Sequence, residues 1–339
     1  MRLSVAEGGG QVGRAGLLRA REPPGQRFCA IMMMHCVVLR QAAWGSQPMC
    51  TQGALIHNQD STAVVNVATV PKRSPFRYAG GKTWLIPRIR EWLGSYATPP
   101  LELIEPFAGG GIVSLTAAAE GLVHRATLVE LDKDVASVWY TLLNGYGRLL
   151  ADEVVRFQLC PENVQAALKR AEDGLYERAF ATILRNRISR GGILAPGAGI
   201  VKHGENGKGL ASRWYPETLR RRILDIVALK HKLRFHEGDG LDYLRRNARR
   251  PDAVFFIDPP YVVAGRRLYT HSDIDHAKLF ETASALVGDF LITYDSTPEI
   301  RGLAARHGFA VREVAMKNTH HAHKTELLIS RDLGWMGNP

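Results

Sequence analysis

Cysteine is scarce in this chain of 339 residues, and its four cysteines form no recognisable pattern. Three of them lie within the first 50 residues, and the fourth is Cys160. Structural zinc sites need closely spaced cysteine or histidine pairs, and disulfide scaffolds are short and rich in cysteine. The cysteine content therefore argues against a disulfide framework and favours a reducing cytoplasmic compartment.

Long hydrophobic runs are also absent. The longest, residues 28–39, is shorter than the roughly 20 residues that cross a bilayer. Basic residues precede it, as in a signal peptide, but no small-residue cleavage site follows. Residues 1–70 lack helical or strand periodicity, so we expect a poorly ordered extension that an upstream start codon would explain. The alternative starts are Met32, Met33, Met34 and Met49.

Acidic residues are too few to balance the basic ones. The chain has 44 Lys and Arg against 33 Asp and Glu, which gives a net charge of +11. Such an excess favours a polyanionic partner, although an ordinary basic enzyme has the same balance. With 45% hydrophobic residues, the chain has enough apolar material for two domains or for one α/β domain with a large insertion.

Two patterns that would indicate other ligands are incomplete. Gly-Gly-Lys-Thr at residues 80–83 lacks the earlier glycine and the preceding strand of a phosphate-binding loop. Three histidines at residues 320–323 have no matching carboxylate or cysteine set, which favours a basic surface over a metal site. We therefore predict neither nucleotide hydrolysis nor a bound metal.

Apolar runs typical of strands recur along the chain, and each of them ends in a glycine turn or an acid. Residues 101–105 lead into Gly109-Gly110-Gly111, residues 126–129 end at Glu130, and residues 233–238 end at Asp239. A helix following the glycine turn allows a ligand to approach the backbone, and an acid after the second strand can accept from ribose hydroxyls. This pattern predicts a nucleoside site without the full dinucleotide fingerprint.

The stretch Asp-Pro-Pro-Tyr at residues 258–261 follows a fourth strand, residues 254–257. Proline cannot donate to a sheet, so the strand must end there and hold Asp258 at its carboxyl end. Tyr261 offers a flat face beside that carboxylate. The combination suits binding of a planar ring with an amino group at its edge, and the alternative is an ordinary strand followed by a proline turn.

Residues 151–232 are rich in arginine and contain a glycine-rich loop at 191–209. Basic side chains interleaved with Trp214 and Tyr215 are typical of a segment that grips nucleic acid, with charge for phosphates and a plane for a base. The alternative is a solvated helical insertion with a core tryptophan. The predicted nucleic-acid contacts are Lys202, Lys208, Arg213, Trp214, Arg220, Arg221 and Arg222.

Periodicity also predicts helices at 83–93, 112–120 and 277–287, a strand at 290–295, and a β-hairpin formed by 309–314 and 326–330. Strands that alternate with helices indicate an α/β fold.

Three motifs in order carry a resemblance to a known family: residues 77–82 (Arg-Tyr-Ala-Gly-Gly-Lys), 105–111 (Glu-Pro-Phe-Ala-Gly-Gly-Gly) and 258–261. Over about residues 74–330 the sequence resembles the S-adenosylmethionine-dependent DNA adenine N6-methyltransferases of the Dam-like group. The resemblance implies a Rossmann-like methyltransferase sheet with helices on both faces, plus an inserted, mainly helical target-recognition domain. The catalytic domain would comprise residues 71–150 and 233–335, and the recognition domain residues 151–232.

The resemblance also implies roles for single residues. The cofactor residues would be Tyr78 and Lys82 at its methionine part and adenine side, Phe107, Gly109 and Gly111 along the cleft, Glu130 at the ribose, and Asp239 at the adenine. The catalytic residues would be Asp258, Pro259, Pro260 and Tyr261. Members of the group often have tryptophan where Tyr78 stands. The insertion at 187–215 differs from that of the GATC-modifying enzymes, so the target sequence is not transferable.

The implied activity is methyl transfer from S-adenosylmethionine to adenine N6 at specific sites of duplex DNA, with the base flipped out of the helix. We expect a cytoplasmic, nucleoid-associated monomer without metal, membrane contact or obligate protein partner. Restriction-modification, phage-borne and solitary roles stay open. So do methylation of RNA or protein, methylation of cytosine N4 (where serine is more usual in place of Asp258), and a catalytically silent nucleic-acid binder.

Overall fold

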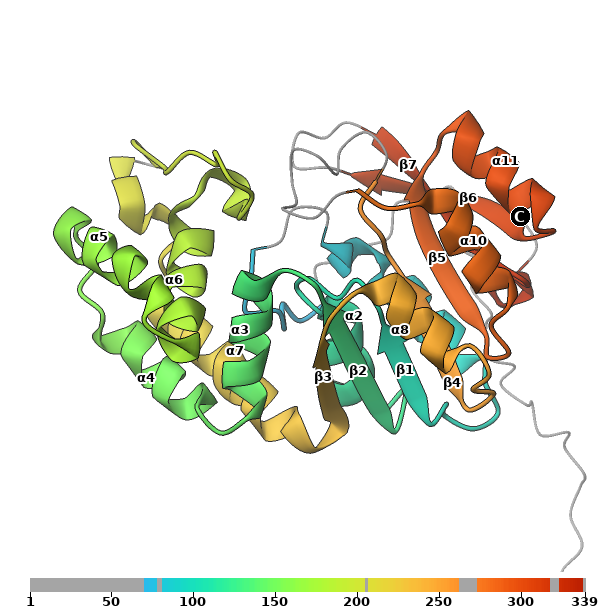
Figure 1. The fold of residues 1–339 in the computed structure, drawn as a ribbon, viewed down its shortest axis with the longest axis horizontal. Coiled ribbons are helices and arrows are strands. Elements are labelled where there is room, and N and C mark those ends of the chain that lie inside the picture. Colours follow the sequence, from blue (N-terminus) through green and yellow to red (C-terminus); the bar gives the residue numbers. More distant parts are fainter. Residues whose placement is uncertain (1–69, 78–80, 205–206, 262–272, 318–322, 338–339) are drawn as a thin grey trace, which may run out of the picture. The chain divides into compact units, whose positions relative to one another are not determined.

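The computed structural model describes residues 70–77, 81–204, 207–261, 273–317 and 323–337. Nearly all of the predicted extension, residues 1–69, lies outside these ranges. The centre of the described part is a seven-stranded sheet with the order β3-β2-β1-β4-β5-β7-β6 (Figure 1). The chain therefore has an α/β fold.

Five strands of the sheet are parallel. They are β1 (Glu102–Glu105), β2 (Arg125–Glu130), β3 (Leu233–Glu237), β4 (Ala253–Ile257) and β5 (Phe290–Asp295). All residues of β1 and β4 are buried, as expected for strands in the middle of a sheet covered on both faces; β4 is apolar throughout, whereas β1 begins and ends with a buried glutamate. The predicted strands are confirmed, although β3 stops two residues before Asp239.

The predicted hairpin is confirmed and forms the far edge of the sheet. It consists of β6 (Ala310–Lys317) and β7 (His323–Ser330), which pair antiparallel with each other. The second strand, β7, also pairs antiparallel with β5, and Asp295 lies opposite Glu326 in that register. Since β7 runs against the parallel strands, its first residues lie at the edge where the parallel strands end.

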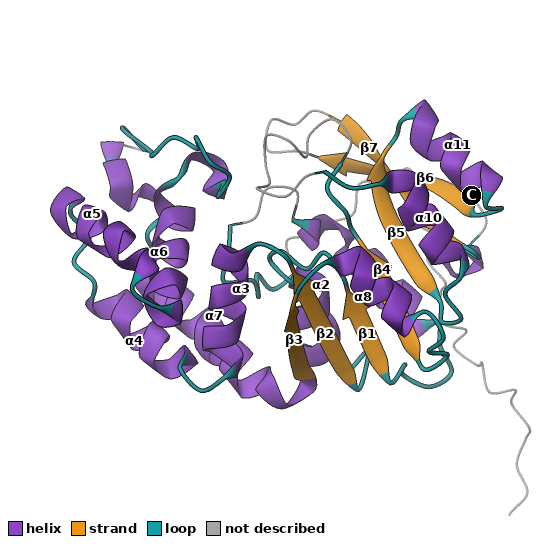
Figure 2. Ribbon diagram, in the orientation of Figure 1, coloured by secondary structure: helices purple, strands orange, loops and turns teal. Residues whose placement is uncertain are grey.

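Helices cover both faces of the sheet, as Figure 2 shows. One core cluster joins Leu103 and Phe256 to α1 (Ile86–Gly94), α2 (Ile112–Ala119) and α3 (Lys133–Leu143). The other joins Ile104 and Phe255 to α8 (Gly240–Asn247), α10 (His276–Ser284) and α11 (Pro298–Arg306). Alternate residues of one strand thus enter opposite cores. The predicted Rossmann-like sheet with helices on both faces is confirmed.

The chain between α3 and β3 is mainly helical. It contains α4 (Gly147–Arg156), α5 (Pro161–Lys169), α6 (Leu175–Ile188) and α7 (Pro216–Leu229). The boundaries of a separate recognition domain stay a prediction. Helices α3 and α6 pack on each other, and an ion pair of 2.9 Å joins Asp134 of α3 to Arg185 of α6. The helical segment is therefore attached to the sheet through α3.

Candidate active site at the carboxyl ends of the strands

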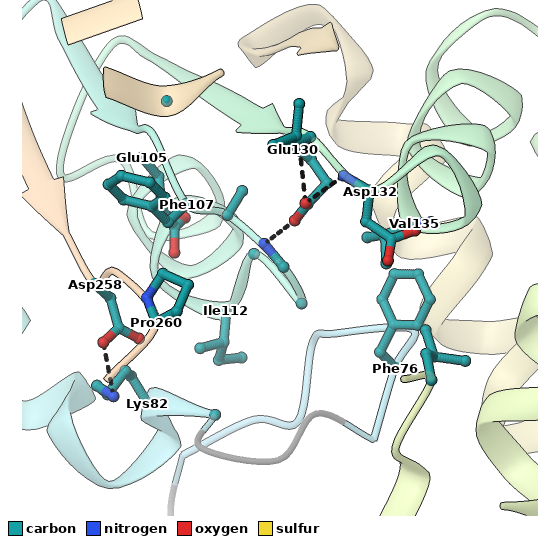
Figure 3. Close-up of a pocket in the computed structure, with 18 of the residues that line it drawn as sticks. Phe76, Lys82, Glu105, Phe107, Ile112, Glu130, Asp132, Val135, Asp258 and Pro260 are labelled. Carbon is teal, nitrogen blue, oxygen red and sulfur yellow. Dashed lines mark hydrogen bonds and ion pairs between the residues drawn. The ribbon is translucent and has the colours of Figure 1, made fainter. Parts of the chain in front are cut away.

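A pocket opens at the carboxyl ends of the parallel strands and collects most of the predicted cofactor and catalytic residues (Figure 3). The predicted residues in its wall are Lys82, Phe107, Gly109, Gly111, Glu130, Asp239, Asp258 and Pro260. Tyr78 lies outside the described ranges. Pro259 is buried. Tyr261 contacts Lys82, which lines the pocket, and therefore lies beside the pocket. Lys82 and Tyr261, which are 179 residues apart in the sequence, meet here.

The glycine loop between β1 and α2 needs glycine for two physical reasons. Gly111 has φ of +61°, a left-handed conformation that favours glycine, and it precedes the first residue of α2. A Cβ atom at Gly111 would also lie 2.5 Å from Leu128 and 2.9 Å from Trp139. The loop is therefore pressed against β2 and α3, and its backbone forms the floor of the pocket.

Glu130 ends β2, and its carboxylate is fixed by backbone N–H groups. Gly109 N donates to Oε2 at 2.9 Å, while Leu131 N and Asp132 N donate to Oε1 at 2.9 Å each (Figure 3). Desolvation raises the pKa of Glu130 to about 7, and the N–H donors oppose this shift. Glu130 thus ties the glycine loop to β2. Its predicted contact with ribose stays a prediction.

Asp239 follows β3 and acts as the N-cap of α8. Its carboxylate accepts a hydrogen bond of 2.8 Å from Asp242 N. The next residue, Gly240, approaches the loop after β1 so closely that a Cβ atom there would lie 2.1 Å from the carbonyl oxygen of Pro106. This contact brings the turns after β1 and β3 together on one side of the pocket.

Asp258 follows β4, and two neighbours fix one of its oxygens. Thr293 of β5 donates from its hydroxyl to Oδ1 at 2.7 Å, and Lys82 Nζ lies 2.9 Å from the same oxygen. Among the residues that the structure describes, no donor binds Oδ2. The side chain is 20% exposed, so Oδ2 is the oxygen available to a ligand in the pocket.

Lys82 is buried and contacts three polar side chains among the described residues, of which the sequence predicted only Asp258 and Tyr261 as site residues. Its ammonium donates to the hydroxyl of Tyr261 at 2.5 Å and lies 3.6 Å from Oε1 of Glu326. The Tyr261 hydroxyl in turn donates to Glu326 Oε1 at 2.6 Å. Burial disfavours the charged ammonium, but Asp258 and Glu326 outweigh burial and raise the pKa of Lys82. The predicted role of Lys82 at the cofactor is untested.

Sequence reasoning missed three polar residues of this site: Glu105, Thr293 and Glu326. Glu105 ends β1 in the pocket wall, and its Oε2 accepts from Ser114 N at 3.0 Å. Burial raises the pKa of Glu105 to about 8. Burial also raises the pKa of Glu326, even though Lys82 pulls it down. An acid within the apolar run of β7 was the one sequence signal for Glu326.

None of the seven residues predicted to contact nucleic acid lines the pocket: three are exposed, three are half-buried and one, Trp214, is buried. Lys202, Lys208 and Arg221 are exposed, and their predicted role is open. Arg213 is half-buried, Arg220 lies 3.3 Å from Asp152, and Arg222 donates to the Ser74 carbonyl at 3.4 Å.

Trp214 is buried in the helical segment, and its predicted contact with nucleic acid stays a prediction. Its residue is 9% exposed, and its ring packs edge-on against Phe157 with centroids 5.9 Å apart. The ring is therefore part of the hydrophobic core, where its apolar area is removed from water.

Within the described ranges, no group of three or more His, Cys, Asp or Glu side chains is arranged to hold a metal ion. His320 and His321 lie outside those ranges. The helices that the structure describes include none that is long and apolar enough to cross a membrane.

Comparison with known proteins finds neither a matching family model nor a matching curated protein. Among solved structures, a putative RNA methyltransferase from Pyrococcus horikoshii aligns with 13% identity and a TM-score of 0.35, covering 75% of this chain and 84% of that chain. The rRNA methyltransferase aviRa from Streptomyces viridochromogenes aligns with 13% identity and a TM-score of 0.35, covering 83% and 99%. TrmK from M. capricolum, in complex with S-adenosyl-homocysteine, aligns with 8% identity and a TM-score of 0.32, covering 72% and 68%. At these TM-scores and identities the alignments identify neither substrate nor activity for this chain.

Proposed function

We propose that this protein transfers a methyl group from S-adenosylmethionine to the N6 amino group of adenine in duplex DNA. One observation carries the proposal: Asp258, held through Oδ1 by Thr293 and Lys82, faces the same pocket as the glycine loop and Glu130. A site that joins a nucleoside-binding loop to a fixed carboxylate can hold a donor and an amino acceptor together.

The residues of the pocket fit such a cofactor. Gly109, Gly110 and Gly111 line the pocket without side chains, so a ligand can approach the backbone of the loop closely. Glu130, Asp132 and Asp239 supply acids in the pocket wall, which suit ribose hydroxyls and a cationic ligand. When bound, S-adenosylmethionine supplies an electrophilic methyl group on a positively charged sulfur.

The remaining residues match the needs of an adenine amino group. Its lone pair is delocalised into the ring, so the nitrogen is a poor nucleophile until its hydrogens are held out of plane. Asp258 Oδ2 would accept one of these hydrogens and take up the proton released as the new carbon–nitrogen bond forms and the carbon–sulfur bond of the methyl donor breaks, which would leave S-adenosylhomocysteine. The ring of Tyr261 would stack on the flipped base. Transfer would then depend on positioning and electrostatics.

Nucleic acid is favoured as the substrate because the helical segment presents exposed cations at Lys202, Lys208 and Arg221. The same site chemistry applies to an RNA base, and RNA methyltransferases are among the solved structures that align with the chain. RNA is therefore the second candidate substrate, and a single assay compares the two.

The test is transfer of tritium from labelled cofactor to duplex DNA, RNA and protein, with wild type, Asp258→Ala and the control Asp173→Ala. Asp173 is an exposed residue paired with Arg170 in the helical segment. We expect label in DNA, loss of at least about 100-fold in Asp258→Ala, and unchanged transfer in the control. Cofactor affinity, measured by calorimetry, should survive in Asp258→Ala.

Label in RNA alone would move the assignment to the second candidate. Full activity of Asp258→Ala would overturn the proposed site, and absence of cofactor binding by the wild-type protein would overturn the proposed function.

A further inference from the structure

Glu326 is a buried acid on the strand that runs against the rest of the sheet. Its side chain is 6% exposed, and it lies opposite Asp295 of β5 in the β7 register. Its Oε2 is buried and has no hydrogen-bond partner within the described part of the chain. A buried carboxylate oxygen without a partner costs free energy, so a purely structural position would favour an apolar side chain.

The other oxygen of Glu326 begins a continuous chain of contacts that leads to Asp258. The Tyr261 hydroxyl donates to Oε1 at 2.6 Å. Lys82 Nζ donates to the Tyr261 hydroxyl at 2.5 Å and lies 2.9 Å from Asp258 Oδ1. Lys82 Nζ also lies over the ring of Tyr261, 4.9 Å from its centroid. Glu326 therefore reaches the Asp258 carboxylate by way of Tyr261 and Lys82, and also through its direct contact of 3.6 Å with Lys82.

The charges in this group give Glu326 a second effect. Lys82 is 3% exposed and lies between two carboxylates, one at 2.9 Å and one at 3.6 Å. If Glu326 were absent, Lys82 would be drawn to Asp258 alone, and the Tyr261 hydroxyl would lose its acceptor. With Glu326 present, the ammonium and the phenol are each held from two sides.

We propose that Glu326 is a positioning residue of the methyl transfer: it holds the Lys82 ammonium and the Tyr261 hydroxyl, and so fixes the Tyr261 ring and the Asp258 carboxylate that face the base. The inference rests on the proposed function. It extends the site to β7, which none of the sequence motifs covers. Glu326 itself does not touch the substrate.

The kinetic test compares wild type with Glu326→Gln, Glu326→Ala and the control Glu313→Gln. Glu313 lies on the same hairpin, 49% exposed, and pairs with Arg301. We expect the single-turnover rate at saturating DNA and cofactor to fall about 10- to 100-fold in Glu326→Gln, as for other residues that orient a reacting group. Glutamine keeps an acceptor oxygen, so Glu326→Ala should be slower still. Cofactor affinity and the control rate should change less than about twofold.

A double-mutant cycle shows whether the effect passes through the hydroxyl. In a Tyr261→Phe background Glu326 keeps only its ion pair with Lys82 at 3.6 Å, so Glu326→Gln should there cost less than in the wild-type background, at most about threefold. Equal costs in both backgrounds would overturn the proposed route, as would an unchanged rate in Glu326→Gln.

A measurement that does not need methyl transfer separates this inference from the proposed function. Acylation of Lys82 by acetic anhydride, followed by mass spectrometry, reports how tightly the ammonium is held. Removing the Glu326 charge should accelerate acylation of Lys82 about threefold or more at pH 8, relative to the exposed Lys202 and to the Glu313→Gln protein.

The two proposals then fail in different ways. A wild-type protein without methyl transfer overturns the proposed function and the role of Glu326 in it, while faster Lys82 acylation still shows that Glu326 holds the ammonium. Methyl transfer with unchanged acylation and unchanged rates in Glu326→Gln overturns the role of Glu326 alone.

Discussion

The most direct physical test of the site concerns Glu105, which is 3% exposed at the end of β1. Burial raises the pKa of this carboxyl from its usual 4.5 to about 8. In the unfolded chain Glu105 releases its proton near pH 4.5, whereas in the folded protein it keeps the proton up to about pH 8. The folded state thus binds more protons between these values, and its stability must fall as pH rises through this window.

The size of the effect follows from the shift. One pKa unit corresponds to about 1.4 kcal/mol, and a group with these two values loses about 3.5 kcal/mol between pH 5 and pH 8. Glu105→Gln cannot ionise and should lack this loss. The free energy of unfolding of wild type should therefore fall by about 2–4 kcal/mol relative to Glu105→Gln over that range. Below pH 4.5 the two proteins should differ by a constant amount.

The assay is urea unfolding followed by tryptophan fluorescence, at pH 5, 6, 7 and 8, with Glu313→Gln as the exposed control. Other buried acids with a raised pKa, such as Glu130, contribute equally to the pH dependence of the unfolding free energy in every variant. Their contribution cancels when the curves of wild type and Glu105→Gln are subtracted. Curves for wild type and Glu105→Gln that stay parallel within about 0.5 kcal/mol across the range would refute a protonated Glu105. The m-values must agree for the comparison to hold.

Three further outcomes are expected. Thr293→Val should slow single-turnover transfer about 10-fold by removing a charge-assisted hydrogen bond to Asp258, and Thr293→Ser should restore most of the rate. Trp214→Ala should lower the free energy of unfolding in urea by about 3 kcal/mol, while Trp214→Phe should leave affinity for nucleic acid unchanged. Replacing Lys208 or Arg221 by glutamine should reduce the slope of log affinity against log salt by about 0.9 per phosphate contact, measured by fluorescence anisotropy.

The sequence predicted the parallel strands well because their pattern is local. A run such as residues 253–257 is short, apolar at every position, rich in β-branched and aromatic residues and soon followed by two prolines, which together favour a strand covered on both faces of a sheet. Helix α11 was missed, although Thr297 caps it and Pro298 occupies its first position, which are standard signals of a helix start. The helix is short and has few apolar residues, and it follows the apolar run of β5 closely in the sequence, so its own periodicity is weak.

The site was predicted in part for the same reason. Glu130 ends β2 and Asp258 directly follows β4, so a pattern read along the chain places them at one edge of the sheet. Trp214 was predicted to face nucleic acid, whereas its ring packs against Phe157, which follows α4 and is distant in the sequence. A sequence pattern reports the spacing of residues and cannot distinguish an aromatic side chain in a core from one that faces a ligand.

The place of Glu326 in the site could not be predicted from the local sequence, because it depends on the direction in which β7 runs in the sheet. In a wholly parallel sheet, the early residues of each strand lie far from the ligand edge. The strand β7 runs in the opposite direction between β5 and β6, so its early residues, including Glu326, lie beside the ends of the parallel strands. Tyr261, 65 residues away along the chain, thereby gains a buried acceptor. The antiparallel strand thus gives the site a carboxylate that no strand of the parallel set can supply from its amino-terminal half.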